Sequence, residues 1–199
     1  MSVAIGSGRG SLNLFPSYSG ARLVSYTHRT LPHDTKEAIL EKFRQGWFEP
    51  RPRPGQRVFE KECTPWVPYR DILVDEVRHT LDGPCDVVVA RAGGGDIAGL
   101  LVWGEEEDAC KIYWLVSDIP GLGGVLVNHV IRHAQAQADR TQGDVDVLVV
   151  SPGYKLAANT HECNDVPEFS LDWYWIRQGF QLDDRLGGCD FYRVVHPRS

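Results

Sequence analysis

Several features that would narrow the class of protein are missing from this sequence. It contains no run of ~18 apolar residues, the length that spans a bilayer. Its N-terminal stretch, MSVAIGSGRGSLNLF, has neither the basic start nor the apolar segment of a secretory signal peptide. The five cysteines are odd in number, lie far apart and form no C-x-x-C pair, which argues against a disulfide framework or a cysteine zinc site. We therefore expect a cytoplasmic protein that does not act at a membrane.

Positive charge is also in short supply. The chain has 21 Lys and Arg residues against 27 Asp and Glu residues, a formal net charge of −6, so its overall electrostatics do not attract nucleic acid. One local exception combines aromatic side chains with Arg51, Arg53 and Arg57. Such a cluster could bind a nucleotide base or a phosphate-bearing acceptor. We favour the alternative, in which the aromatic residues are core and the arginines are solvated.

What the sequence does contain indicates one folded domain. Its 199 residues, 42% of them hydrophobic, are enough to bury a single core. Residues 1–20 are rich in Gly and Ser, and we expect a flexible N-terminal arm there. Residues 21–199 then form the domain, without internal repeats.

Hydrophobic periodicity from residue 21 onward predicts strands and helices in a definite order. Residues 21–30 fit a strand, and a helix follows that begins with a capping box of Asp34 and Glu37. The remaining predicted elements are a helix at 69–81, strands at 86–91, 97–103 and 111–117, a helix after the glycine turn, a strand at 145–150, a helix at 170–178 and strands at 181–184 and 190–195. Short turns make the three central strands antiparallel. The strand after the central helix should lie parallel to the strand before it.

The functional prediction depends on residues 111–138. The strand KIYWLVSD is expected to turn Ile112 and Trp114 to the same face, because side chains alternate along a strand. Three glycines follow it, directly before an amphipathic helix: Gly121, Gly123 and Gly124. Amides at a helix start lack partners, the dipole there is positive, and glycine lets a ligand approach the backbone. We predict an anion site, for a pyrophosphate, at this helix N-terminus.

Three segments in this order resemble the GNAT superfamily of acetyl-coenzyme A-dependent N-acetyltransferases. The segment IAGLLVWG is similar to their third strand, GLGGVLVNHVIRHA to the start of their coenzyme A helix, and WYWIRQGF to their aromatic helix that ends in Gly-Phe. The resemblance covers roughly residues 21–196. It implies an α/β, GNAT-like single domain with a mixed, mostly antiparallel twisted sheet flanked by helices.

The resemblance also implies a cofactor, acetyl-CoA, and a place for it. Its pantetheine arm would lie along Leu115, Val116 and Ser117, where the family splays two neighbouring strands. Its pyrophosphate would sit on four amides of the turn: Gly121, Leu122, Gly123 and Gly124. A neutral amine would then attack the thioester directly, helped by a base and by a donor to the leaving thiolate.

Two positions depart from the family pattern. When the glycines are aligned on R/Q-x-x-G-x-G/A, Asp118 stands where Arg or Gln is usual. Trp175 occupies the place of the tyrosine that protonates the thiolate in many members, and an indole N–H cannot give up its proton. Tyr174 is the neighbouring phenol, although helical spacing predicts that it points elsewhere.

We name three candidate catalytic residues. Asp118 could be a general base at the end of the central strand, or it could cap the following helix. Tyr174 could donate to the leaving thiolate. Ser151 could contact the acceptor, or it could be an ordinary turn residue before Pro152.

Two further groups are interpreted as structural. His129 and His133 have a helical spacing that can bind a metal, but no Glu follows His129, so we expect an exposed helix face and no metal. The acidic run at 105–108 is expected to be a solvated hairpin turn rather than a site for a cationic acceptor.

The sequence leaves three functions open. The first is acetyl transfer from acetyl-CoA to a primary amine of a small molecule or peptide. The second is a binding protein that keeps the GNAT-like fold without turnover. The third is an enzyme of that fold that modifies a nucleotide or nucleic acid through Arg51, Arg53 and Arg57. The acceptor and the oligomeric state stay open, with a dimer among the options.

Overall fold

The computed structural model describes residues 21–47, 66–150, 171–183 and 190–198. The predicted flexible arm, the arginine cluster and Ser151 lie outside these ranges. Within them, none of the helices is both long and apolar enough to cross a membrane.

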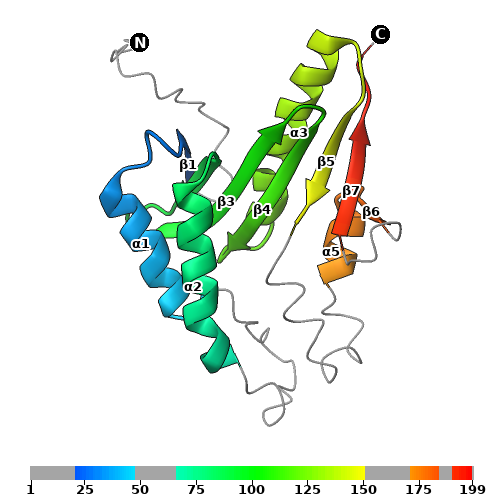
Figure 1. Ribbon diagram of the computed structural model, residues 1–199. Helices are drawn as coiled ribbons and strands as arrows, with labels where there is room; N and C mark the ends of the chain where they lie inside the picture. Colours follow the sequence, from blue (N-terminus) through cyan, green and yellow to red (C-terminus); the bar gives the residue numbers. More distant parts are fainter. Residues whose placement is uncertain (1–20, 48–65, 151–170, 184–189, 199) are drawn as a thin grey trace.

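The described chain forms one seven-stranded sheet with helices on both faces (Figure 1). In chain order the elements are β1 (Arg22–Thr27), α1 (His33–Arg44), α2 (Trp66–Asp82), β2 (Asp86–Arg91), β3 (Ile97–Glu106), β4 (Ala109–Ser117), α3 (Leu122–Thr141), β5 (Val145–Val149), α5 (Leu171–Arg177), β6 (Gln181–Asp183) and β7 (Asp190–Val195). The strand order is β1-β2-β3-β4-β5-β7-β6. Only β4 and β5 pair in parallel, so the sheet is mixed and mostly antiparallel, as predicted.

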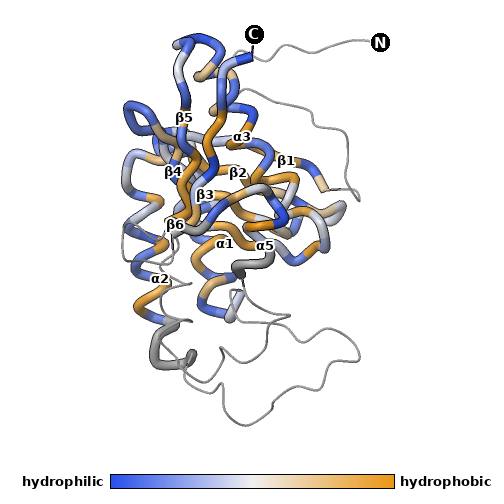
Figure 2. Tube along the Cα trace, turned by 90° about the vertical axis from the view of Figure 1, so that its right-hand side faces the viewer, coloured by the Kyte–Doolittle hydropathy of each residue, from blue (hydrophilic) through white to orange (hydrophobic). Residues whose placement is uncertain are grey.

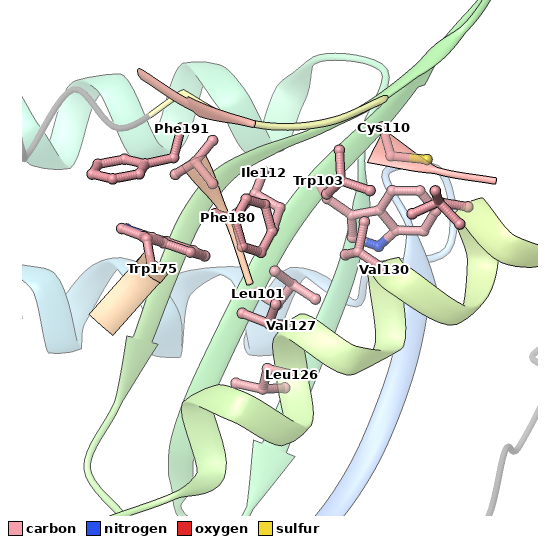
Figure 3. Close-up of a cluster of buried hydrophobic side chains, with 14 of the residues drawn as sticks. Leu101, Trp103, Cys110, Ile112, Leu126, Val127, Val130, Trp175, Phe180 and Phe191 are labelled. Carbon is pink, nitrogen blue, oxygen red and sulfur yellow. The ribbon is translucent and has the colours of Figure 1, made fainter. Parts of the chain in front are cut away.

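Two hydrophobic cores lie on opposite faces of this sheet. Helices α1 and α2 cover one face, where Phe43 and Leu73 are fully buried. Helix α3 covers the other, where Leu126, Val127 and Val130 pack along the sheet (Figure 3). The most hydrophobic stretches run through the strands, and most turns at the rim are hydrophilic (Figure 2). Because helices cover both faces of the sheet, β2 and most of β3 are buried continuously, whereas burial alternates along β5 and the first part of β4.

The start of α1 differs from the prediction. The helix begins at His33 after Pro32, and no side chain caps it. Asp34 lies inside the first turn instead of in front of it, so the predicted capping box does not form. An acidic residue still favours this end of the helix through the dipole.

The facing of side chains along β4 also differs from the prediction. Val102 of β3 pairs with Trp114, but the next residue, Trp103, pairs with Ile112, which leaves Tyr113 as an extra residue in β4. This β-bulge turns Ile112 into the α3 core and Trp114 into the α1–α2 core. The two side chains therefore do not share a face, because strict alternation fails at a bulge.

Candidate functional site

Strand β4 separates from β5 halfway along its length. Pairing runs in parallel from Ala109 opposite Asp146 to Ile112 opposite Val149. The last link is the Val150 amide, which donates to the Ile112 carbonyl at 2.8 Å.

Beyond Ile112, β4 continues through Tyr113–Ser117, of which Trp114–Ser117 pair with β3. None of these five residues pairs with β5 in the described chain. The separation begins at the bulged Tyr113. A bulge bends and twists its strand, which accounts for the loss of pairing at this point. The open edge carries backbone donors and acceptors that an extended ligand could pair with, as an added strand would.

The predicted binding residues Leu115, Val116 and Ser117 lie on this open segment. Leu115 packs against the α3 core and Val116 against the α1–α2 core, so their side chains are used by the fold. Their backbone edge has no strand partner on the β5 side among the described residues. The Ser117 hydroxyl donates to the Ile119 carbonyl at 2.9 Å and thereby helps to fix the turn into α3.

The glycine turn brings the N-terminus of α3 next to the open edge. Gly121 is the N-cap and has a φ of 82°, which favours glycine, and no side chain caps the helix. The Leu122 amide donates to the Ile119 carbonyl at 3.1 Å and so takes part in the turn itself. The amides of Gly123 and Gly124 belong to the first helical turn, where no carbonyl of the helix can accept from them. These two amides are the clearest candidates for anion contacts.

Helix α5 lies against this first turn of α3. A Cβ built on Gly123 would be 2.8 Å from the Tyr174 hydroxyl oxygen, and one on Gly124 would be 3.3 Å from Nε2 of Gln178. The two α5-side residues are four apart and so occupy one helix face. The glycines therefore also serve to let α5 approach.

Tyr174 thus points toward the glycine turn, contrary to the expectation that it would point elsewhere. Trp175, at the position that the family pattern would give to tyrosine, is buried in the α3 core against Phe180. Figure 3 shows Trp175, Phe180 and Phe191 together at this end of the core. The spacing of Tyr174 and Gln178 in the sequence indicates that they share one helix face. The sequence does not indicate that this face packs against the start of α3.

The hydroxyl of Tyr174 is buried and has no hydrogen-bond partner among the described residues. Burial raises the pKa of this hydroxyl above its ordinary value. The group therefore stays protonated and remains a donor. A buried hydroxyl without a partner is costly, and a ligand at the glycine turn could satisfy it.

Asp118 lies at the end of β4, and its side chain turns to the α1 face of the sheet. Its Oδ2 accepts from Nζ of Lys42 at 2.7 Å, and its Oδ1 accepts from Nε1 of Trp47 at 2.9 Å. Its amide donates to the Ala98 carbonyl at 2.8 Å. Asp118 therefore does not cap α3, which corrects that alternative. Lys42 was missed in the sequence because it is 76 positions away and no local pattern relates the two.

The paired histidines are half-buried against Trp103 rather than fully exposed. The ring of His133 lies 4.6 Å from that of Trp103, and His129 lies 6.4 Å from it. Burial lowers the pKa of His129. In the part of the chain that the structure describes, no group of three or more ligand-type residues could hold a metal ion.

The acidic run is exposed, as expected, but only Glu107 and Asp108 form the turn, whereas Glu105 and Glu106 end β3 and are paired. Glu105 lies 3.5 Å from Nε2 of His133, and Glu106 forms an ion pair with Lys111 at 2.7 Å. The Glu106–Lys111 pair links β3 to β4, and the Glu105–His133 contact links β3 to α3.

Comparison with known proteins finds likeness in three-dimensional structure. No protein-family model and no curated protein matches the sequence. An acetyltransferase of the GNAT family from Staphylococcus aureus Mu50 matches with a TM-score of 0.51 and 13% identity, over 88% of this chain and 99% of that one. The aminoglycoside 6'-N-acetyltransferase from Enterococcus faecium matches with a TM-score of 0.51 and 13% identity, over 89% and 98%. An aminoglycoside 6'-N-acetyltransferase complexed with coenzyme A matches with a TM-score of 0.50 and 12% identity, over 88% and 99%.

These matches define the class of fold. The chain has the fold of the GNAT acetyltransferases, and its mixed sheet with flanking helices agrees with the predicted architecture. At 12% and 13% identity, the likeness extends to the fold and not to the acceptor.

Proposed function

We propose that this protein is an N-acyltransferase that uses acetyl-CoA to acetylate a primary amine. The observation that carries the proposal is the open edge of β4 at Tyr113–Ser117, which lies directly before the uncapped, glycine-rich start of α3. An extended arm and a pair of phosphates joined in one molecule fit these two features together.

The described residues suit coenzyme A in three respects. The β4 edge offers main-chain hydrogen bonds to an amide-containing arm, and the amides of Gly123 and Gly124 offer donors to phosphate at the positive end of a helix dipole. The buried hydroxyl of Tyr174 adds a donor at the same turn. Acetyl-CoA would supply the acyl group as a thioester that an amine can attack.

Among the predicted catalytic residues, we propose a direct role for Tyr174 as a hydrogen-bond donor to the bound coenzyme. Burial raises the pKa of Tyr174, which makes its hydroxyl a poor source of a whole proton for the leaving thiolate. The Tyr174 hydroxyl can donate a hydrogen bond without losing its proton. The neighbour Trp175 faces the core, so it does not take the place of an acid.

General base catalysis by Asp118 stays a prediction. The carboxylate already accepts from Lys42 and Trp47, and it would have to exchange one of these donors for the attacking amine. An acceptor contact by Ser151 also stays a prediction, because that residue lies outside the described ranges.

The test is calorimetric titration with coenzyme A, followed by an acetyl-transfer assay with acetyl-CoA and a library of amines. When the free coenzyme A concentration is 100 times the dissociation constant, binding should also raise the free energy of unfolding by about 2.7 kcal/mol, which thermal unfolding would measure. Acetylation of any member of the library supports the proposal. Binding without transfer would favour the alternative of an inactive binding protein, and no binding would overturn both.

A different experiment distinguishes the third hypothesis, an enzyme that modifies a nucleotide or nucleic acid, from the acetyltransferase and from the inactive binding protein. Oligonucleotide binding that weakens with salt and is lost when Arg51, Arg53 and Arg57 are neutralised would favour it. No observation in the described residues supports this alternative at present.

A further inference from the structure

Asp118 carries a negative charge close to the proposed anion site, where it would repel a phosphate. The residue is three positions before Gly121, the N-cap of α3, and the turn between them is closed by the bond from the Leu122 amide to Ile119. A carboxylate at the start of a helix is attracted to its uncapped amides and to the dipole. Left free, Asp118 would compete with a phosphate for the amides of Gly123 and Gly124.

The structure holds this carboxylate on the opposite side of the sheet. Lys42 donates to Asp118 Oδ2 at 2.7 Å and also to the Ile97 carbonyl, and its ammonium lies 4.5 Å from the centre of the Trp47 ring. The Trp47 indole donates to the other carboxylate oxygen at 2.9 Å. Both oxygens of Asp118 thus accept hydrogen bonds, one from Lys42 in α1 and one from Trp47 in the turn after α1.

This ion pair is more than an ordinary surface contact. The side chains of Lys42 and Asp118 are 28% and 23% exposed, and Trp47 is buried against Phe43. An ion pair that is partly removed from water and anchored by an aromatic ring keeps one geometry better than an exposed pair does. The carbonyl of Ile97 gives Lys42 a fixed position relative to β3.

We propose that Lys42 is a positioning residue that holds Asp118 on the α1 face and thereby keeps the start of α3 open to the phosphates of coenzyme A. This inference rests on the proposed function, since it concerns the same anion site. It explains why an aspartate can stand immediately before a phosphate-binding turn. It also assigns a role to α1, which carries Lys42 and otherwise contributes packing to the opposite core.

The test uses calorimetric titration of coenzyme A into matched variants, after circular dichroism has verified the fold of each. Lys42→Met should weaken binding about tenfold, because Asp118 becomes free to occupy and repel the anion site. The double variant Lys42→Met/Asp118→Asn should return to within about twofold of the parent, since no carboxylate is then left to compete. Lys42→Arg, which keeps the ion pair, should bind like the parent. Raising the salt from about 0.05 M to about 0.5 M should shrink the Lys42→Met defect.

A matched control is Lys36→Met. Lys36 lies on the same helix and pairs with Asp82 of α2, away from the glycine turn, and this variant should bind normally. If Lys42→Met binds like the parent, or if the double variant stays as weak as Lys42→Met, the positioning role is wrong. Should Lys42→Met fail to fold, Asp118→Asn alone decides: affinity equal to or above the parent supports the role, and a tenfold loss contradicts it. If the parent itself binds no coenzyme A, the proposed function fails and this inference fails with it.

Discussion

At the scale of single residues, the site depends on groups whose neighbours are far away in the sequence. The missing side chain of Gly123 has two consequences: a ligand can approach its amide closely, and Tyr174 has room beside it. Tyr174 in turn is useful only because α5 places it there. Each of these two residues can be tested by adding or removing a single group.

Replacing Gly123 with Ala should both destabilise the protein and weaken coenzyme A binding. The new Cβ would be 2.8 Å from the Tyr174 hydroxyl oxygen, and relief of such overpacking typically costs about 1–3 kcal/mol. Thermal unfolding and titration would measure the two effects. The double variant with Tyr174→Phe should recover part of the stability, because the next ring atom is at 3.4 Å. Gly93→Ala, which meets nothing within 4 Å, is the control, and an equal loss in it would contradict the account.

Replacing Tyr174 with Phe should separate binding from stability. The hydroxyl has no partner among the described residues, so its removal should leave the unfolding midpoint unchanged or raise it slightly. Coenzyme A affinity should fall about tenfold through loss of a donor to a charged or polar ligand group. Tyr192→Phe removes a hydroxyl that bonds to Gln181 at 3.1 Å on another part of the surface and should bind normally. An unchanged affinity in Tyr174→Phe would exclude the proposed contact.

At the scale of elements, the sheet was largely readable from the sequence and the site was not. Short apolar segments between turn residues gave β2 and β7 their full bounds, and they gave β5 with one residue too many at its end. The parallel pairing of β4 with β5 followed from the helix that connects them. The bulge at Tyr113 could not be predicted, because KIYWLVS alternates well enough to pass for a regular strand. The bulge is what reverses the facing of Trp114 and marks where β5 leaves.

The open edge of β4 has a signature in hydrogen exchange. The amides in Tyr113–Ser117 that do not bond to β3 should exchange faster than those in Ala109–Ile112, which lie between two strands. Saturating coenzyme A should slow them, because the arm would take the place of a neighbouring strand. Strand β2, which is paired on both sides, should show no local change. Protection of Tyr113–Ser117 without ligand would mean that the edge is already closed.

At the scale of the whole molecule, two cores on opposite faces bury groups that must stay neutral. Burial raises the pKa of the Cys85 thiol to about 11 and that of Cys110 to about 12. An unfolded thiol loses its proton near its ordinary value of 9.0, whereas the folded one keeps it. The buried thiols therefore make their full contribution to the free energy of unfolding below about pH 9, and this contribution falls as the pH rises above that value.

Chemical denaturation at about pH 8 and about pH 10 should consequently show a falling free energy of unfolding, by about 1 kcal/mol for each buried thiol. Cys110→Ala should reduce the size of this fall. Tyr174, whose pKa burial also raises, adds to the fall near its ordinary value of about 10. A stability that is flat across this range would mean that the thiols are as accessible in the folded state as in the unfolded one.

The overall architecture was predictable from the sequence because it depends on summed local signals, namely hydrophobic periodicity, glycine positions and connection lengths. The arrangement of Lys42, Trp47 and Asp118 was not, since it joins α1 to the end of β4 across the fold. The same is true of Tyr174 and Gly123, which meet only after α5 docks on α3. Local patterns define elements, whereas the chemistry of this site arises from contacts between them.

The central claim is that the free edge of β4 and the first turn of α3 together hold coenzyme A. The most direct measurement is an experimental structure of the protein with coenzyme A bound. We expect the pantetheine arm to be hydrogen-bonded along Tyr113–Ser117 and the paired phosphates to lie on the amides of Gly123 and Gly124. A coenzyme bound elsewhere, or a β4 edge that stays filled by this chain's own residues at saturating ligand, would contradict it.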